Sequence, residues 1–171
     1  ISIIFNIIEK FFSKFLCTSI ITATESIAKN FPKNKTLVIN NYPIISQSQH
    51  SVFEYSNKEN AIIYIGLISK IRGIHEMIEA FMKLKNKNIK FYIAGPFENN
   101  ILKEKILNEI NLISNIDYLG FLDRKNVTKY LLKSRLGMVL FHPEPNHIES
   151  GPNKMFEYMS VGLPIVGSSF P

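Results

Sequence analysis

From residue 61 onward, short uninterrupted apolar runs alternate with segments whose apolar residues recur at helical spacing. The apolar runs occupy residues 61–66, 89–95, 116–120, 136–141 and 164–167. Helical spacing is seen between them, at residues 74–84, 102–110 and 127–131. An apolar run without polar alternation is typical of a strand covered on both faces. Strands that recur every 20–30 residues or so, with helices between them, build parallel sheets. The pattern predicts an α/β fold with an open, Rossmann-like parallel sheet.

The first 60 residues are organised differently. A helix is expected at residues 3–15 and a strand at 17–23 with Cys17 in its buried core, followed by a further strand at 36–39. Residues 44–60 are polar and rich in Ser, Asn and Gln, as interdomain linkers are. We therefore expect residues 1–43 to end one α/β domain, residues 44–60 to be a linker, and residues 61–171 to form most of a second domain.

Composition narrows the functional classes. The 171 residues are 46% hydrophobic and 20% charged, with a net charge of +6, so the chain is neither disordered nor fibrous. Lys and Arg are scattered, and no nucleic-acid-binding module is recognisable, so we expect no nucleic acid partner. The single cysteine cannot form an intramolecular disulfide and suits a reducing cytoplasm.

The strongest candidate chemistry lies in residues 142–159. Pro152 suits a first helical position, and Gly151 lets a ligand approach the backbone. A helix beginning there directs the amides of Asn153, Lys154 and Met155 toward a phosphate. Glu149 precedes this group of amides and Glu157 follows it. Two carboxylates that flank a phosphate site suit a nucleoside diphosphate sugar, because they would accept hydrogen bonds from its hydroxyl groups. The alternative is that both carboxylates are solvated surface charges.

The motif Glu149-SGPNKMF-Glu157-YMSVGLPIVGSS resembles the signature of the retaining GT-B glycosyltransferases of the "glycosyl transferases group 1" family. Residues 64–73, 78–81, 93–96 and 118–120 support the resemblance in the donor-binding domain, and residues 20–25 and 38–43 resemble the end of the family's N-terminal, acceptor-side domain. The resemblance implies an incomplete GT-B fold that is truncated at its C-terminal end.

The resemblance also implies roles for particular residues. Glu149 would act as the catalytic residue that orients the donor sugar, and Glu157 would bind the ribose. Gly66 and Arg72 would contact the diphosphate, with Gly66 alternatively serving only a turn. The family commonly has an Arg where this chain has Leu67, so half of its cationic clamp is missing. Lys70 or Lys154 would compensate, and the sequence leaves that choice open.

The expected function is transfer of a sugar, with retention, from a nucleotide-diphosphate sugar to a glycan or lipid-linked acceptor. No cofactor or metal is expected. The isolated chain should be inactive, because acceptor-side groups belong to the N-terminal domain. The alternative is a non-catalytic nucleotide-sugar-binding or interaction module of the same fold, for which Leu67 is the best argument.

Two further features have alternative interpretations. His142, Glu144, His147 and Glu149 are residue types that bind zinc, but their spacing matches no standard site. Residues 1–16 carry four Phe beside Lys10 and Lys14 and are too short and too charged to span a bilayer. They would either face the core of the first domain or rest on a membrane surface, which would place the protein at the cytoplasmic face of the membrane.

Overall fold

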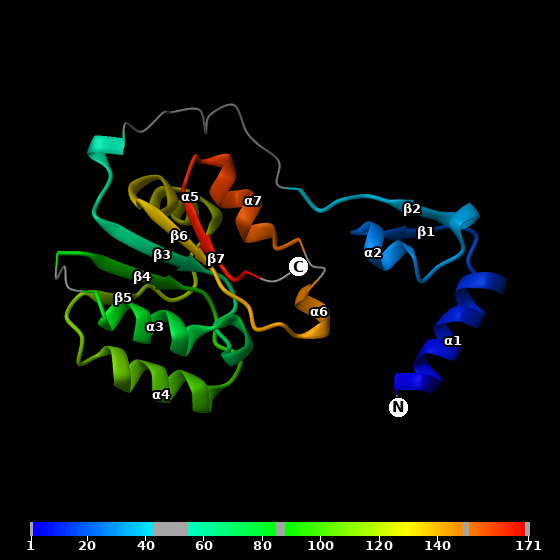
Figure 1. The fold of residues 1–171 in the computed structure, drawn as a ribbon, viewed down its shortest axis with the longest axis horizontal. Coiled ribbons are helices and arrows are strands. Elements are labelled where there is room, and N and C mark those ends of the chain that lie inside the picture. Colours follow the sequence, from blue (N-terminus) through cyan, green and yellow to red (C-terminus); the bar gives the residue numbers. More distant parts are fainter. Residues whose placement is uncertain (1, 43–54, 85–87, 149–150, 170–171) are drawn as a thin grey trace. The chain divides into compact units, whose positions relative to one another are not determined.

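The computed structural model describes residues 2–42, 55–84, 88–148 and 151–169 (Figure 1). Within them, residues 2–42 form a small compact unit, and residues 55–148 together with 152–169 form a larger one. The predicted linker at 44–60 lies mostly outside the described residues. Its last part contains the 3-10 helix η3 (Tyr55–Asn57).

The larger unit is built on a five-stranded parallel sheet. Its strands are β3 (Ala61–Ile65), β4 (Lys90–Ala94), β5 (Ile116–Tyr118), β6 (Leu136–Val139) and β7 (Ile165–Gly167), in the spatial order β5-β4-β3-β6-β7. Each strand coincides with one of the five apolar runs of the sequence, and every pairing is parallel. The predicted parallel α/β sheet is therefore confirmed.

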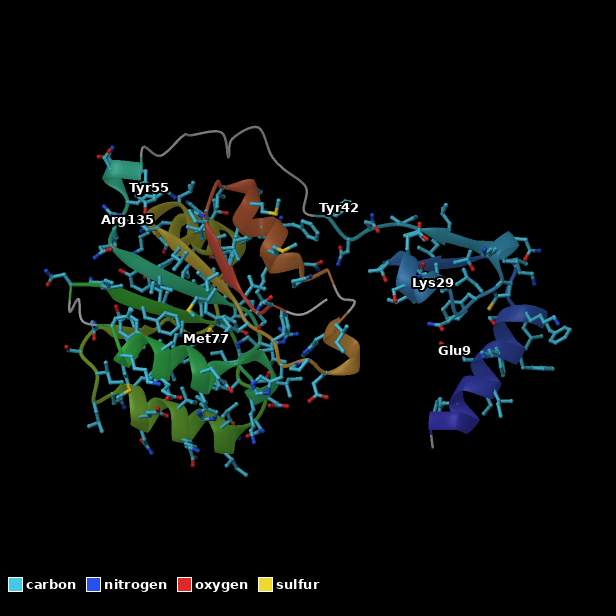
Figure 2. All side chains as sticks on the ribbon, viewed as in Figure 1. Glu9, Lys29, Tyr42, Tyr55, Met77 and Arg135 are labelled. Atoms are coloured by element: carbon cyan, nitrogen blue, oxygen red, sulfur yellow. The ribbon has the colours of Figure 1, made fainter. Side chains whose placement is uncertain are left out.

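Helices cover both faces of this sheet. In Figure 1, α3 (Ile74–Met82) and α4 (Asn100–Ile110) lie below it, whereas α5 (Arg124–Lys133) and α7 (Asn153–Ser160) lie above it. Successive strand residues point to opposite faces of the sheet. Phe91 and Ile93 therefore enter the core between the sheet and α3, while Tyr92 enters the core on the other face. Met77 of α3, labelled in Figure 2, is completely buried in the lower core. Burial on both faces explains the uninterrupted apolar runs.

Local signals start two of the helices. The side chain of Asn99 accepts a hydrogen bond from the Leu102 amide at 2.8 Å, which caps α4. Asp123 caps α5 in the same way through the amide of Asn126, also at 2.8 Å. A short polar side chain at this position satisfies an amide that has no partner within the helix. The helix starts are thus encoded next to each apolar pattern.

The strand order reverses between β3 and β6. The chain leaves β3 toward β4 on one side, while β6 and β7 lie on the other side. In open parallel sheets, ligands bind at the carboxyl ends of strands where the order reverses in this way. The loop after β3, which contains η4 (Lys70–Arg72), and the loop after β6, which contains α6 (Pro145–Ile148), both leave this edge.

The small unit contains α1 (Ser2–Phe15), β1 (Ile20–Thr22), α2 (Glu25–Ala28), η1 (Lys33–Lys35) and β2 (Thr36–Val38), with β1 and β2 paired in parallel. The expectation for Cys17 is wrong: the strand begins three residues later and Cys17 is only half-buried. The chain turns here instead, since the amides of Leu16 and Cys17 both bond the Phe12 carbonyl. An apolar run alone could not reveal that turn.

Much of the apolar surface of α1 faces solvent within this chain. Phe5, Phe11 and Phe15 are 55–68% exposed, and Ile7 is exposed to a similar degree. The described residues therefore do not bury these side chains in a core, which was one of the two interpretations of residues 1–16. Among those residues, no helix combines the length and hydropathy that a membrane crossing requires.

Candidate functional site

Gly66, directly after β3, forms the floor of the candidate site. Its φ of +136° and the φ of +130° at Gly95, after β4, are backbone conformations that favour glycine. A Cβ on Gly95 would lie 2.0 Å from the Gly66 carbonyl oxygen, so the ends of β3 and β4 touch. A Cβ on Gly66 would lie 3.0 Å from the Lys154 Nζ and 3.7 Å from the Arg72 Nη1. Gly66 therefore has a turn conformation that favours glycine and lies against Gly95. The absence of a Cβ on Gly66 leaves room for the side chains of Lys154 and Arg72.

Lys154 reaches this point from the first turn of α7. Although it is a lysine, it is only 8% exposed. Its Nζ lies 4.0 Å from the centre of the Tyr64 ring and 5.5 Å from that of Phe141, within reach of cation–π attraction. Among the described residues, Nζ has no hydrogen-bond partner. Burial, together with the nearby Arg72, lowers the pKa of Lys154 from 10.5 to about 7, although Glu157 opposes the change.

Arg72 is the second cation at the site. It ends η4, and its guanidinium carbon lies 5.7 Å from the centre of the Phe141 ring. Lys70 lies on the same short helix but is exposed to solvent, as is Leu67. The structure thus brings Arg72 and Lys154 together beside Gly66, whereas no described contact places Lys70 there.

The first turn of α7 differs from the expectation in one respect. Pro152 is the residue before the helix, and its carbonyl accepts a hydrogen bond from the Met155 amide at 2.9 Å. Because that bond engages Met155, the prediction that its amide is available to a phosphate is wrong. The amides of Asn153 and Lys154 remain in the first turn, where helix amides have no intrahelical partner. Gly151 is exposed immediately before Pro152.

Of the two carboxylates of the signature, Glu157 belongs to the described residues and Glu149 does not. Glu157 is half-buried on α7, three residues beyond Lys154, and close enough to raise the pKa of Lys154. Such a spacing puts both side chains on one face of the helix. Glu149 lies outside the described residues, so its predicted role stays a prediction.

Tyr64, Phe141 and Tyr158 are absent from the sequence-based candidates. Tyr64 donates a hydrogen bond from its hydroxyl to the Leu67 carbonyl at 2.7 Å, and the Tyr158 hydroxyl accepts one from the Ile65 amide at 3.0 Å. The first bond shapes the loop after β3, and the second holds α7 against the end of β3. A signal existed for one of them: Lys154 and Tyr158 are four residues apart, so both belong to the buried face of α7.

His142 contributes to the position of the Arg72 loop. Its Nε2 lies 2.8 Å from a Glu76 carboxylate oxygen on α3, and its amide donates to the Ile71 carbonyl, also at 2.8 Å. These contacts join the end of β6 to η4. Within the part of the chain that the structure describes, no group of three or more His, Cys, Asp or Glu is placed to hold a metal ion.

The chain is similar in sequence to known glycosyltransferases. The family model "Glycosyl transferases group 1" matches residues 46–171. The chain is 25% identical, over 89% of its length, to the capsular polysaccharide biosynthesis glycosyltransferase CapM of Staphylococcus aureus. It is 26% identical, over 93% of its length, to an uncharacterised glycosyltransferase of Methanocaldococcus jannaschii. It spans 43% and 41% of those two proteins, which is less than half of each.

Solved structures show the same architecture. Anabaena Alr3699/HepE, in complex with UDP-glucose, superposes with a TM-score of 0.69 at 17% identity, covering 96% of this chain and 48% of that protein. Staphylococcus aureus TarM, in a complex that contains UDP, superposes with a TM-score of 0.64 at 20% identity, covering 90% and 30%. The Rossmann-like α/β sheet is thus part of a GT-B fold, of which the chain covers about half. With a family model that matches most of its length, the chain belongs to the glycosyl transferases group 1 family.

Proposed function

We propose that the larger unit binds a nucleotide-diphosphate sugar, and that the protein transfers this sugar to an acceptor with retention of configuration. The observation that carries the proposal is the meeting of two cationic side chains, Arg72 and Lys154, at Gly66, on the ligand-binding edge of the parallel sheet. Complexes of HepE with UDP-glucose and of TarM with UDP support a donor of this class.

In the proposed reaction, the site stabilises the diphosphate as it leaves the sugar. Negative charge develops on that group as the glycosidic bond breaks, and preorganised donors lower the energy of the transition state most when water is excluded. Arg72 and Lys154 supply two positive charges, and the first amides of α7 supply partial charge. In this proposal Glu157 accepts hydrogen bonds from the ribose, Glu149 orients the sugar, and no metal or other cofactor takes part.

The alternative, a non-catalytic binding module, drew its support from Leu67. Lys154 supplies the second cation from another element, so the argument from Leu67 loses its force. We therefore favour the enzyme over the module.

The acceptor is proposed to be a glycan or a lipid-linked glycan at the cytoplasmic side of a membrane. The relation to CapM, a capsular polysaccharide biosynthesis enzyme, supports this class of acceptor. The exposed apolar side chains of α1 suit either the core of an N-terminal domain or a membrane surface. Co-sedimentation of the chain with anionic vesicles distinguishes these two, because only membrane contact predicts capture that is lost in Phe11→Ser.

The central test is a calorimetric titration of the chain with UDP, GDP and uridine. We expect one of the two nucleotides to bind, and the diphosphate to contribute most of the affinity. Failure of both nucleotides to bind would contradict the proposal. Sugar transfer should be measurable in a longer protein that includes an acceptor-side domain, whereas the 171-residue chain alone should show none. Transfer by this chain alone would contradict the two-domain mechanism.

A further inference from the structure

Lys154 is an unusual component of an anion-binding site, because its ammonium group is buried without a partner. It is 8% exposed, and its Nζ donates a hydrogen bond to no acceptor among the described residues. Among the described residues, the charged and titratable groups that face it are Tyr64 on β3, Arg72 on η4 and Glu157 on α7. A buried charge that is not hydrogen-bonded is expensive, and proteins commonly relieve the cost by neutralising the group.

Only one of the two cations can be neutralised. A guanidinium stays charged at any physiological pH, whereas a lysine loses its proton readily when it is desolvated. Arg72 beside Lys154 adds a like charge that makes the protonated amine still less favourable. The aromatic ring of Tyr64, 4.0 Å away, attracts the ammonium only weakly by comparison with a carboxylate.

We propose that, above pH 7, Lys154 is largely an unprotonated amine in the free protein and takes up one proton when the donor diphosphate binds. This inference rests on the proposed function, since it requires the diphosphate to lie beside Arg72 and Lys154. The proton comes from the solvent buffer and adds to Nζ, and no other bond changes. Donor binding thereby assembles the second positive charge that the leaving diphosphate needs.

The direction of the pH dependence follows from this exchange. The pKa of Lys154 is about 7 in the free protein, and a diphosphate in contact with the amine raises it. Below pH 7 the amine is already protonated, so affinity changes little with pH. Above pH 7 binding requires the amine to take up a proton from the solvent, so the affinity falls by up to about tenfold for each pH unit until the pKa of the complex is reached.

Calorimetry of the 171-residue chain tests the proposal, with UDP-glucose and GDP-mannose as probes. Their diphosphate diesters carry no proton that titrates near neutral pH, so proton exchange reports the protein. Titrations at about pH 8 in Tris and in HEPES, which differ in ionisation enthalpy, should reveal uptake of nearly one proton per bound donor. At about pH 6 the uptake should fall close to zero.

Three variants isolate Lys154. Lys154→Met should lose both the proton uptake and at least about tenfold in affinity. Lys154→Arg, whose charge is permanent, should bind without proton uptake and without the loss of affinity above pH 7. Lys70→Met is the matched control, and it should retain the affinity and the uptake of the unsubstituted chain. A ¹³C NMR titration of the lysine Cε signals should independently show one lysine, absent in Lys154→Met, that titrates near neutral pH.

The possible failures are distinguishable. If the unsubstituted chain binds neither nucleotide sugar, the proposed function fails and this inference fails with it. If the chain binds a donor without proton uptake at about pH 8, or if Lys154→Met retains the uptake, this inference is overturned and the proposed function stands. A Lys154 NMR signal that titrates with the ordinary lysines would also overturn it, whatever the affinities.

Discussion

The lysines at the two ends of the parallel sheet differ in whether their ammonium groups have hydrogen-bond or ion-pair partners. At the amino-terminal end, Lys58 is buried but donates a hydrogen bond to the Ser134 carbonyl at 3.2 Å. Lys133 pairs with Glu59 at 3.2 Å, and the Tyr92 hydroxyl donates to the same carboxylate. In Figure 2, Tyr55 and Arg135 lie close together at this end, and the Arg135 guanidinium carbon is 5.3 Å from the ring centre. The lysines here are structural.

At the carboxyl end, Lys154 is buried to a similar degree as Lys58 but lacks any such partner among the described residues. Two cations face each other beside Gly66 instead of a cation facing a carboxylate. Folding alone gains nothing from this arrangement, because an unpaired buried charge is destabilising. The comparison shows that burial alone does not distinguish the two lysines: the Lys58 ammonium has a hydrogen-bond acceptor, whereas the Lys154 ammonium has none among the described residues.

The largest expected effect comes from Gly95→Ala, which removes the close contact of the strand ends at the carboxyl edge. Its Cβ would lie 2.0 Å from the Gly66 carbonyl oxygen, and the backbone there has a positive φ. Strain and overpacking together should lower the free energy of unfolding by about 3–4 kcal/mol. Urea unfolding measures the loss. Gly120→Ala is the control, because its Cβ would meet no described atom within 4 Å and should cost about 1 kcal/mol.

The next effect sharpens the contrast between the lysines. Lys154→Met should raise the free energy of unfolding by about 1–4 kcal/mol near pH 7, because folding of the unsubstituted chain must either bury the unpaired Lys154 charge or release its proton. Since the folded pKa, about 7, lies below the ordinary 10.5, the unfolded chain binds more protons between these values. The stability of the unsubstituted chain therefore rises with pH in this window, and the advantage of Lys154→Met shrinks.

Lys133→Met, at the other end of the sheet, is the matched comparison. It breaks the pair with Glu59 and should lower the free energy of unfolding by about 0.5–1 kcal/mol, since both side chains are partly exposed. Thermal unfolding at several pH values measures both variants. Destabilisation by both substitutions would remove the distinction between the two ends.

Arg72→Ala is expected to weaken binding rather than folding. Loss of a charged partner of the diphosphate should reduce the affinity for UDP by about 10–100-fold, equivalent to roughly 1.5–3 kcal/mol, and leave uridine affected little. High salt should erode the advantage of the unsubstituted chain, because Arg72 is only half-buried. Calorimetry with UDP and uridine gives both affinities. An equal or larger loss in Lys70→Ala would show that the loop has been assigned incorrectly.

The smallest effect on nucleotide binding is expected for Glu157→Ala. If Glu157 binds the ribose, UDP and uridine should both weaken by the same factor, about 5–30-fold or 1–2 kcal/mol. The free energy of unfolding should change little, since substitutions of helix-surface residues are usually near neutral. A loss confined to UDP would mean that Glu157 acts through Lys154, whose proton it favours, and not through the ribose.

Much of the fold could be predicted because its determinants are local. The apolar runs that become β3 to β7 are visible in the sequence. The caps at Asn99 and Asp123 are also local, although they were not predicted. Where a turn depended on a few backbone bonds, prediction failed, as at Cys17 and at the Met155 amide. The signature around Glu157 indicated the family, and its placement of the donor site stays a prediction. Tyr64 and Phe141 carry no motif.

The sequence by itself determined the parallel α/β sheet and the family, because apolar periodicity and a contiguous motif are properties of neighbouring residues. Only the tertiary structure decided between Lys70 and Lys154 as the partner of Arg72. Lys154 is 82 positions from Arg72 in the numbering of the chain, and the two meet because α7 returns to the carboxyl end of β3. The charge state of an amine depends on such distant neighbours and on burial, which no local pattern encodes.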